Sequence, residues 1–219
     1  MPSLMIELVG ETVGLDPDGA LWWPGSATLF VADLHLGKGA VFRSRGIPVP
    51  TGSSSKTLKM LSVAIGRYPA KRVVILGDLL HARESRGAQL INEIVAWRRE
   101  HQDLAIMLVP GNHDRTAQTD AREVEMEFLE EGSPMGPFRL LHNPPKDDSA
   151  EPWLAGHLHP TVRLKGRAAE RMRMRCFWHR GNGLVLPAMG VFTGGMDVEP
   201  QEGDCLYICA GDRVLPIRG

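Results

Sequence analysis

Residues 104–114 read LAIMLVPGNHD, and this stretch decides how the rest of the chain is interpreted. Its first half is an almost continuous apolar run, which is typical of a strand buried on both faces of a sheet. Pro110 and Gly111 end the run, and an amide, an imidazole and a carboxylate follow at Asn112, His113 and Asp114. Apolar runs that end in polar residues recur in ATLFVADLH (27–35) and RVVILGDLLH (72–81). The pattern predicts three buried strands.

Two helical patterns separate these strands, at residues 53–69 and 86–101. Serines can cap the start of the first segment, and Pro69 marks its end. In both segments apolar residues recur at helical spacing: Leu58, Leu61 and Ile65, then Leu90 or Ile91, Ile94 and Trp97. Because strand and helix alternate, the first half predicts βαβ units, a parallel sheet and the α/β class.

After Asp114 the pattern changes to short runs with period two. In EVEMEFLEE (123–131), Val124, Met126 and Phe128 alternate with acidic residues, which predicts a half-exposed strand. The segment GSPMGP (132–137) is interpreted as a turn, and FRLLH (138–142) as the next strand. Further short runs follow to the end of the chain, so the second half is predicted to be mostly β.

Length and composition set the broad class of protein. A chain of 219 residues suits a single domain over residues 1–219, and the near balance of 25 Lys and Arg against 26 Asp and Glu excludes blanket phosphate binding. We expect no signal peptide, because residues 1–10 lack a charged start and a long apolar run, and no membrane span. Three cysteines do not read as a disulfide framework, so we expect a cytoplasmic protein. The composition leaves a homo-oligomer open.

Carboxylate and imidazole side chains fall at the predicted strand ends throughout the chain. They are Asp33, His35, Asp78, Asn112, His113, His142, His157 and His159. Ligands of open α/β sheets bind outside the carboxyl ends of the strands, so these segments should converge on one edge. Oxygen and imidazole donors without cysteine suit Mn²⁺, Zn²⁺ or Fe²⁺. The neighbouring Gly77, Gly111 and Gly156 permit tight turns.

Each piece has an ordinary structural interpretation when it is taken alone. A single Asp-x-His or His-x-His is more often a turn or a surface pair, and Asn and Asp are common turn formers. Five pieces in one order, all at strand ends, favour a metal site.

The motifs DLH (33–35), LGD (76–78), GNHD (111–114), His142 and GHLH (156–159) resemble, as an ordered set, the calcineurin-like metallophosphoesterases. The resemblance implies a four-layer α/β/β/α sandwich, with two packed mixed β-sheets flanked by helices, and two adjacent metal ions. One ion would take four side chains: Asp33, His35, Asp78 and His159. The other would share Asp78 and take three more: Asn112, His142 and His157. His113 would lie near the leaving group, and Asp114 would orient it.

A closer resemblance covers DLHLGKGAVFRSRGIPVPTGSSSKTL (33–58), LGDLLHAR (76–83) and LPAMGVFTGGMDV (186–198). These segments look like the DNA ligase-associated metallophosphoesterases, a bacterial group encoded beside a DNA ligase, a helicase and an exonuclease. The resemblance implies a DNA-repair phosphodiesterase or endonuclease.

Phosphodiester hydrolysis requires an activated water and cover for negative charge, and two ions about 3.5–4 Å apart supply both through a bridging hydroxide. The resemblance therefore implies a phosphodiesterase with two divalent ions, Mn²⁺ first and Zn²⁺ or Fe²⁺ as alternatives, and DNA as the substrate. Two alternatives stay open. One is a phosphomonoesterase or nucleotide pyrophosphatase on the same site, and the other is a non-catalytic interaction module.

Several residues outside the motifs could contact nucleic acid. Arg43, Arg83 and Arg115 could bind flanking phosphates, or could form a solvated loop face. The basic segment 167–175, which contains Arg167 and Arg175, could follow nucleic acid or could protect a sheet edge. Trp22 and Trp23 could stack on bases.

Overall fold

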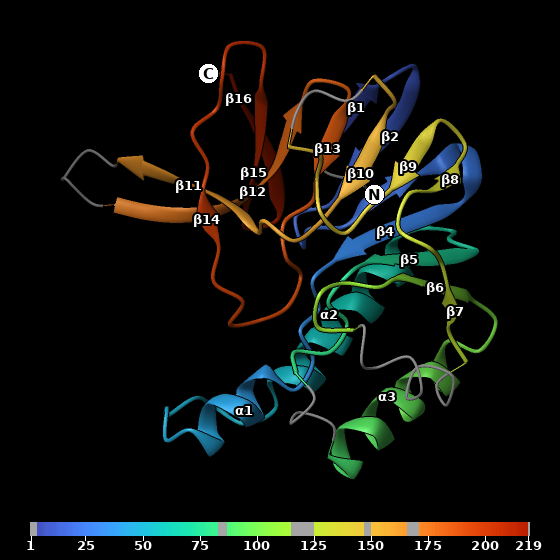
Figure 1. The fold of residues 1–219 in the computed structure, drawn as a ribbon, viewed down its shortest axis with the longest axis vertical. Coiled ribbons are helices and arrows are strands. Elements are labelled where there is room, and N and C mark those ends of the chain that lie inside the picture. Colours follow the sequence, from blue (N-terminus) through green and yellow to red (C-terminus); the bar gives the residue numbers. More distant parts are fainter. Residues whose placement is uncertain (1–3, 83–86, 115–124, 147–149, 166–170, 219) are drawn as a thin grey trace.

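The computed structural model describes residues 4–82, 87–114, 125–146, 150–165 and 171–218 (Figure 1). It contains two mixed β-sheets and three α-helices, which confirms the α/β class and the two packed sheets. No helix of this described part is both long and apolar enough to cross a membrane.

The first sheet has seven strands that lie side by side in chain order. They are β1 (Leu4–Leu8), β2 (Glu11–Leu15), β3 (Leu21–Trp23), β4 (Thr28–Ala32), β5 (Arg72–Leu76), β6 (Ala105–Val109) and β7 (Glu127–Phe128). The strands from β1 to β4 are antiparallel, and those from β4 to β7 are parallel. Ala32 lies opposite Leu76, and Leu76 lies opposite Val109. The three predicted central strands therefore end at one level of the sheet.

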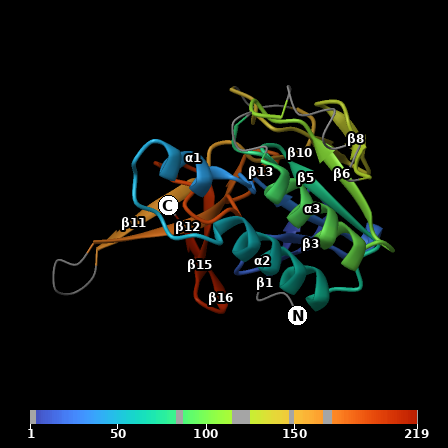
Figure 2. The same cartoon turned by 90° about the horizontal axis from the view of Figure 1, so that it is seen from below.

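Three helices and one short 3₁₀ turn accompany this sheet: η1 (Pro24–Ser26), α1 (Lys38–Ser44), α2 (Ser53–Arg67) and α3 (Ala88–Glu100). Both predicted helices are confirmed, and Leu58, Leu61 and Ile65 of α2 are buried as expected. In α3, the buried residues are Leu90, Ile94 and Trp97, which belong to the same apolar cluster as the three α2 residues. Figure 2 shows both helices from the side that they cover.

The second sheet has nine strands. They are β8 (Ser133–Met135), β9 (Phe138–Leu140), β10 (Trp153–Ala155), β11 (Pro160–Lys165), β12 (Arg171–Arg180), β13 (Gly183–Val185), β14 (Met196–Asp197), β15 (Cys205–Ala210) and β16 (Arg213–Arg218). The main path runs β14-β11-β12-β13-β10-β9-β8, and β15 pairs with β12 and β16. Parallel pairs of β10 with β9 and β13 bring the strand before His157 into the middle of the sheet.

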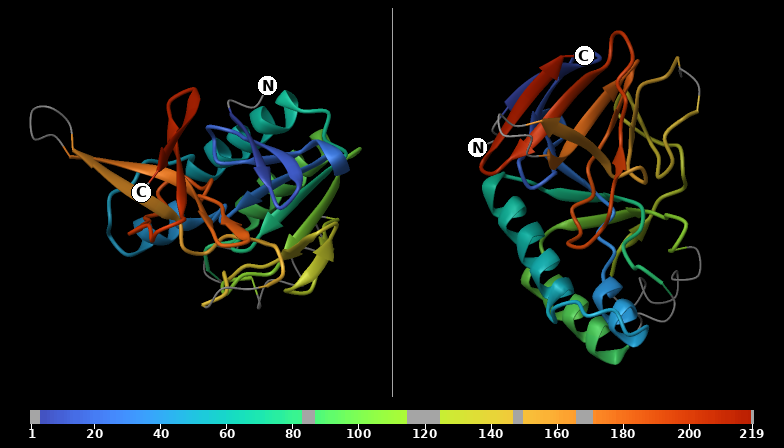
Figure 3. Two further views of the ribbon diagram at one scale, coloured as in Figure 1. Left: turned by 90° about the horizontal axis from the view of Figure 1, so that it is seen from above. Right: turned by 90° about the vertical axis from the view of Figure 1, so that its left-hand side faces the viewer.

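Three apolar clusters hold these layers together. One lies between α2, α3 and the first sheet, and a second, which includes Phe30, Phe138 and Phe177, lies between the two sheets. The third, around Trp153 and Ile208, lies on the outer face of the second sheet and contains no residue of a described helix. The described helices therefore form one layer, against the first sheet (Figure 3).

Two local predictions differ from the structure. Residues Ser133–Met135 of the predicted turn form β8, and the turn narrows to Gly136 and Pro137. A proline is tolerated at Pro134 because β8 is an edge strand. The predicted alternating strand is reduced to Glu127–Phe128, and Val124 lies outside the described residues.

Candidate metal centre

The loops after β4 and β5 run beside each other and carry the two central carboxylates. The backbone N–H of Asp33 donates to the Gly77 carbonyl at 3.2 Å, and that of His35 donates to the Asp78 carbonyl at 2.8 Å. These bonds continue the parallel pairing past the strand ends, so Asp33 and Asp78 are held beside each other. Both side chains are buried.

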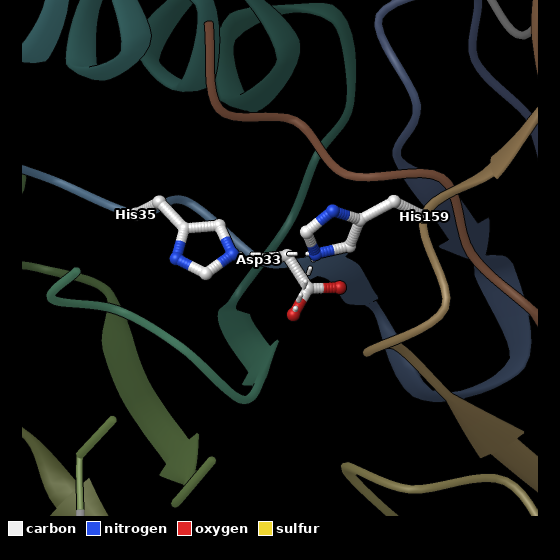
Figure 4. Close-up of side chains that lie close together, drawn as sticks. All are labelled: Asp33, His35 and His159. Carbon is white, nitrogen blue, oxygen red and sulfur yellow. Dashed lines mark hydrogen bonds and ion pairs between the residues drawn. The ribbon is translucent and has the colours of Figure 1, made fainter. Parts of the chain in front are cut away.

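One donor group consists of Asp33, His35 and His159, whose ligand atoms lie within 4.8 Å of one another. The Nε2 atoms of His35 and His159 are 3.2 Å apart, and Nε2 of His159 lies 3.6 Å from Oδ1 of Asp33. Figure 4 shows the two imidazoles on either side of the Asp33 carboxylate, on loops that come from opposite sheets.

A second group shares Asp33 and adds Asp78 and His142. Nε2 of His142 lies 3.7 Å from Oδ1 of Asp78, and Nδ1 of His142 lies 3.8 Å from Oδ1 of Asp33. His157 joins this group, because its Nδ1 lies 3.0 Å from Nε2 of His142. Six of the seven predicted ligands are thus connected through a continuous series of close pairs.

The GNHD loop (residues 111–114) lies against Asp78 and carries the remaining predicted site residues, Asn112, His113 and Asp114. The backbone N–H of His113 donates to Oδ1 of Asp78 at 3.1 Å, and Asn112, which precedes it in the loop, is exposed. The imidazole of His113 is 44% exposed, with its Nε2 4.0 Å from Oδ2 of Asp78. His113 therefore lies at the surface of an otherwise buried cluster.

Asp114 was predicted to orient His113, but its carboxylate accepts backbone N–H groups instead. Its oxygens accept from Leu79, Leu80 and Gly111 at 3.0–3.1 Å, and the side chain is fully buried. Burial raises the pKa of Asp114, while these three hydrogen bonds favour the carboxylate. Asp114 thus joins the loop after β5 to the loop after β6.

Backbone strain is concentrated at the predicted ligands. Among the described residues nine non-glycine positions have a positive φ, and five of these are predicted ligands: Asp33 (53°), His35 (44°), Asp78 (47°), His157 (69°) and His159 (48°). The left-handed region is unfavourable for such residues, and strain of this kind clusters at functional sites. The surrounding hydrogen bonds hold these residues in place.

The glycines beside the ligands mainly provide space. A Cβ atom at Gly77 would lie 1.8 Å from Nδ1 of His142, and one at Gly111 would lie 2.2 Å from Oδ1 of Asp78. Only Gly77 of the three predicted turn glycines has a positive φ. The sequence predicts a tight turn at Gly111. In the structure this position requires glycine because Asp78 lies too close to leave room for a Cβ atom.

The donor set fits a divalent metal. Among the buried side-chain polar atoms of the described residues, Oδ1 of Asp33 is the one without a hydrogen-bond partner, and it points at the histidines of both groups. An orphaned buried carboxylate oxygen is costly unless a cation meets it. Burial, reinforced by His159, lowers the pKa of His35 to about 2, and burial also lowers the pKa of His157. Neutral imidazoles of this kind have a lone pair available for a metal.

The structure adds His81, which was not predicted as a site residue. Its Nδ1 lies 3.5 Å from Nδ1 of His35, on the side opposite to the Nε2 atom that faces Asp78. Its ring also stacks against His113 at 5.4 Å. Its position at the end of LGDLLH was the available signal, and only the fold shows that it turns back to the centre.

The predicted nucleic-acid contacts have mixed outcomes. Arg43 is exposed and donates to the Pro50 carbonyl at 3.0 Å. Trp22 and Trp23 are 6% and 5% exposed and pack against Tyr68 and Phe138, so the predicted base stacking is wrong. Arg83, Arg115 and Arg167 lie outside the described residues.

Comparisons with known proteins address the family and the fold of the chain. A model of the calcineurin-like phosphoesterase family matches residues 27–180. The crystal structure of Pseudomonas putida nuclease MPE is similar with a TM-score of 0.85, at 34% sequence identity over 98% of this chain and 99% of that chain. The protein of unknown function AQ665 from Aquifex aeolicus reaches a TM-score of 0.41 at 16% identity, over 60% and 78% of the two chains. A search among curated proteins gave no match.

Proposed function

Because this chain belongs to the calcineurin-like metallophosphoesterases, we propose that it is a divalent-metal-dependent phosphodiesterase that cleaves nucleic acid. The observation that carries the proposal is the meeting of Asp33 and Asp78 with four histidines around the orphaned Oδ1 of Asp33. The similarity to a nuclease over nearly the whole chain supports nucleic acid as the substrate class.

The family resemblance implies how two ions would be held by these side chains. The first would take Asp33, His35, Asp78 and His159, and the second would share Asp78 with Asn112, His142 and His157. Carboxylate, amide and imidazole donors suit Mn²⁺ first, with Zn²⁺ or Fe²⁺ as alternatives. When bound, such a pair of ions lowers the pKa of water and neutralises charge on the phosphoryl oxygens.

The protein itself supplies positioning and a proton donor. His113 is the exposed imidazole above the buried carboxylates, so it can donate a proton or a hydrogen bond to the departing oxygen. Asp114 is a positioning residue, because its three backbone contacts fix the loops that carry Asp78 and His113. A single domain over residues 1–219 would be sufficient for this chemistry.

The finer assignment is a role in DNA repair. The segments 33–58 and 186–198 resemble the DNA ligase-associated group, and we therefore infer a functional link to a DNA ligase, a helicase and an exonuclease. Cys176, Cys205 and Cys209 are free thiols, which is consistent with the reducing cytoplasm as the place of action.

A substrate comparison with one metal at a time tests the proposal. Purified protein would be assayed with Mn²⁺, Zn²⁺, Fe²⁺ or Mg²⁺ on single- and double-stranded oligonucleotides, bis-p-nitrophenyl phosphate and p-nitrophenyl phosphate. We expect cleavage of oligonucleotides and of the diester above the monoester, and loss of activity with a chelator. Faster turnover of the monoester, together with intact oligonucleotides, would indicate a phosphomonoesterase instead.

A further inference from the structure

A groove of about 640 Å³ is lined by Gly190, whose N–H donates to the Asp33 carbonyl, and by Thr161, two residues after His159. One wall comes from α1 and α2 through Phe42, Lys56 and Met60, and the other comes from the base of the β11–β12 hairpin. Residues 189–195 line the groove between these walls. Figures 2 and 3 show the β11–β12 hairpin reaching out from the body of the protein.

The segment 189–196 is fixed to the backbone of the predicted ligands at both ends. At its start, the N–H of Gly190 donates to the Asp33 carbonyl at 3.1 Å, and at its end the N–H of Met196 donates to the His159 carbonyl at 3.1 Å. In its middle, the N–H of Val191 donates to Oγ1 of Thr57 at 3.2 Å. These three hydrogen bonds hold the segment 189–196 in place beside the predicted metal ligands.

Phe192 lies near the middle of the segment 189–196. Its side chain is 48% exposed, and its backbone has a φ of 61°. A bulky side chain is unfavourable in the left-handed region, and an exposed phenyl ring gains little burial. The ring itself therefore contributes little burial to the folded chain, and a flat apolar ligand would bury it.

The groove is positively charged. Its charged lining residues are Lys56, Arg173 and Arg175, and no acidic residue belongs to the lining. Arg173 is paired with Asp197, while Arg175 donates to the Ala188 carbonyl. Lys56 is exposed and has no ion pair with another described residue, so its charge is available to an anion.

We propose that this groove holds an unpaired nucleotide next to the scissile phosphate, with the base stacked on Phe192 and a phosphate beside Lys56. An exposed aromatic ring among cations is the chemistry that binds single-stranded nucleic acid, because every base has a π-face and every link has a charge. The base must be unpaired, since a paired base is already stacked within its duplex. This subsite rests on the proposed nuclease function and extends it to a position beyond the metals.

The test compares Phe192→Ala, Phe192→Leu and Phe192→Trp on a single-stranded oligonucleotide and on bis-p-nitrophenyl phosphate, which has no base. Stacking on an aromatic side chain corresponds to about a five- to 150-fold effect on affinity. We expect KM for the oligonucleotide to rise by such a factor in the Ala and Leu variants, more than any change in kcat, and Trp to restore it. Leu215→Ala, at an exposed apolar residue of β16 outside the groove, should match the wild type on both substrates.

An abasic scan locates the contact. One abasic nucleotide would be placed at each position around the cleavage point, and at one position the wild type and Phe192→Ala should become equal. Lys56→Ala should lower the slope of log affinity against log salt by about 0.7.

The outcomes separate the two proposals. If the wild type hydrolyses the diester but neither binds nor cleaves oligonucleotides, the nuclease function fails and the subsite fails with it. If the wild type cleaves oligonucleotides and both Phe192→Ala and Phe192→Leu retain its KM, only the subsite is overturned.

Discussion

The backbone N–H of His157 donates a 2.7 Å hydrogen bond to Oδ2 of Asp33, and the two residues are 124 positions apart in the chain. One oxygen of Asp33 is thereby fixed, while the other, Oδ1, is buried without a hydrogen-bond partner. The contact joins the first sheet to the second at the point where the donor groups meet. Because Oδ1 has no hydrogen-bond partner, the metal-free and the metal-bound protein should differ in stability through this atom.

Metal binding should stabilise the fold, because a cation satisfies Oδ1 of Asp33. At a free metal concentration of 100 times Kd the gain is about 2.7 kcal/mol, which thermal unfolding with and without Mn²⁺ would measure. Asp33→Asn should remove most of this gain and should leave the metal-free protein at least as stable as the wild type, since a buried charge is neutralised. Asp212→Asn, at an exposed carboxylate, is the control. A gain in Asp33→Asn equal to that of the wild type would contradict the assignment.

Asp78→Asn and His113→Ala should reduce phosphodiester turnover while the fold survives. His113→Ala removes the proton donor and should lower kcat by about 10²–10⁴-fold. Asp78→Asn removes the carboxylate that is proposed to bind both ions. Circular dichroism would monitor the fold, and His101→Ala, at a histidine bonded to Ser62, is the matched control. Near wild-type rates in metal-supplemented assays would argue against these roles.

His81→Ala should weaken metal binding without the removal of a ligand. The contact between the Nδ1 atoms of His81 and His35 orients the ring of His35, and loss of such a partner costs about 10–100-fold in metal affinity. His81→Gln, which keeps a hydrogen-bonding group, should recover part of the loss. Metal titration followed by calorimetry is the measurement, and an unchanged affinity in His81→Ala would exclude this positioning role.

Gly111→Ala should lower the affinity for metal, whereas Gly66→Ala should raise the stability of the fold. An added Cβ at Gly111 would collide with Oδ1 of Asp78 at 2.2 Å, so the carboxylate must move and metal affinity should fall. Gly66 lies within α2 with open space around it, and alanine there should stabilise the fold by about 0.5–1 kcal/mol. Denaturant unfolding and metal titration distinguish the two effects, and tight metal binding in Gly111→Ala would refute the first.

Stability should fall at alkaline pH because of two buried thiols. Burial raises the pKa of Cys176 and of Cys209 to about 12, from an ordinary value of 9.0. Between about pH 9 and pH 12 the thiols ionise in the unfolded state but keep their protons in the folded state. Ionisation therefore stabilises the unfolded state, and the free energy of unfolding falls as the pH rises through this range. Denaturant midpoints at about pH 8 and about pH 10.5 would measure the loss. The double variant Cys176→Ala/Cys209→Ala should lose less, and an equal loss would exclude the thiols as the cause.

The sequence by itself determined the central strands, the helices α2 and α3, and the identity of the polar residues at the strand ends. These features are local, because apolar periodicity and capping residues act over a few positions. The edge strands were less predictable. Ser133–Met135 forms a strand because it pairs with Phe138–Leu140, and pairing partners are not visible in a short run of residues.

Only the tertiary structure decided how the site is assembled. The register of β4, β5 and β6 aligns Asp33 with Asp78, and the packing of the second sheet brings His142, His157 and His159 to them. Other tertiary contacts turned Asp114 to the backbone, brought His81 to His35, buried Trp22 and Trp23, and left Phe192 exposed. The sequence specifies which groups are available, but their distances and burial depend on contacts between residues more than a hundred positions apart.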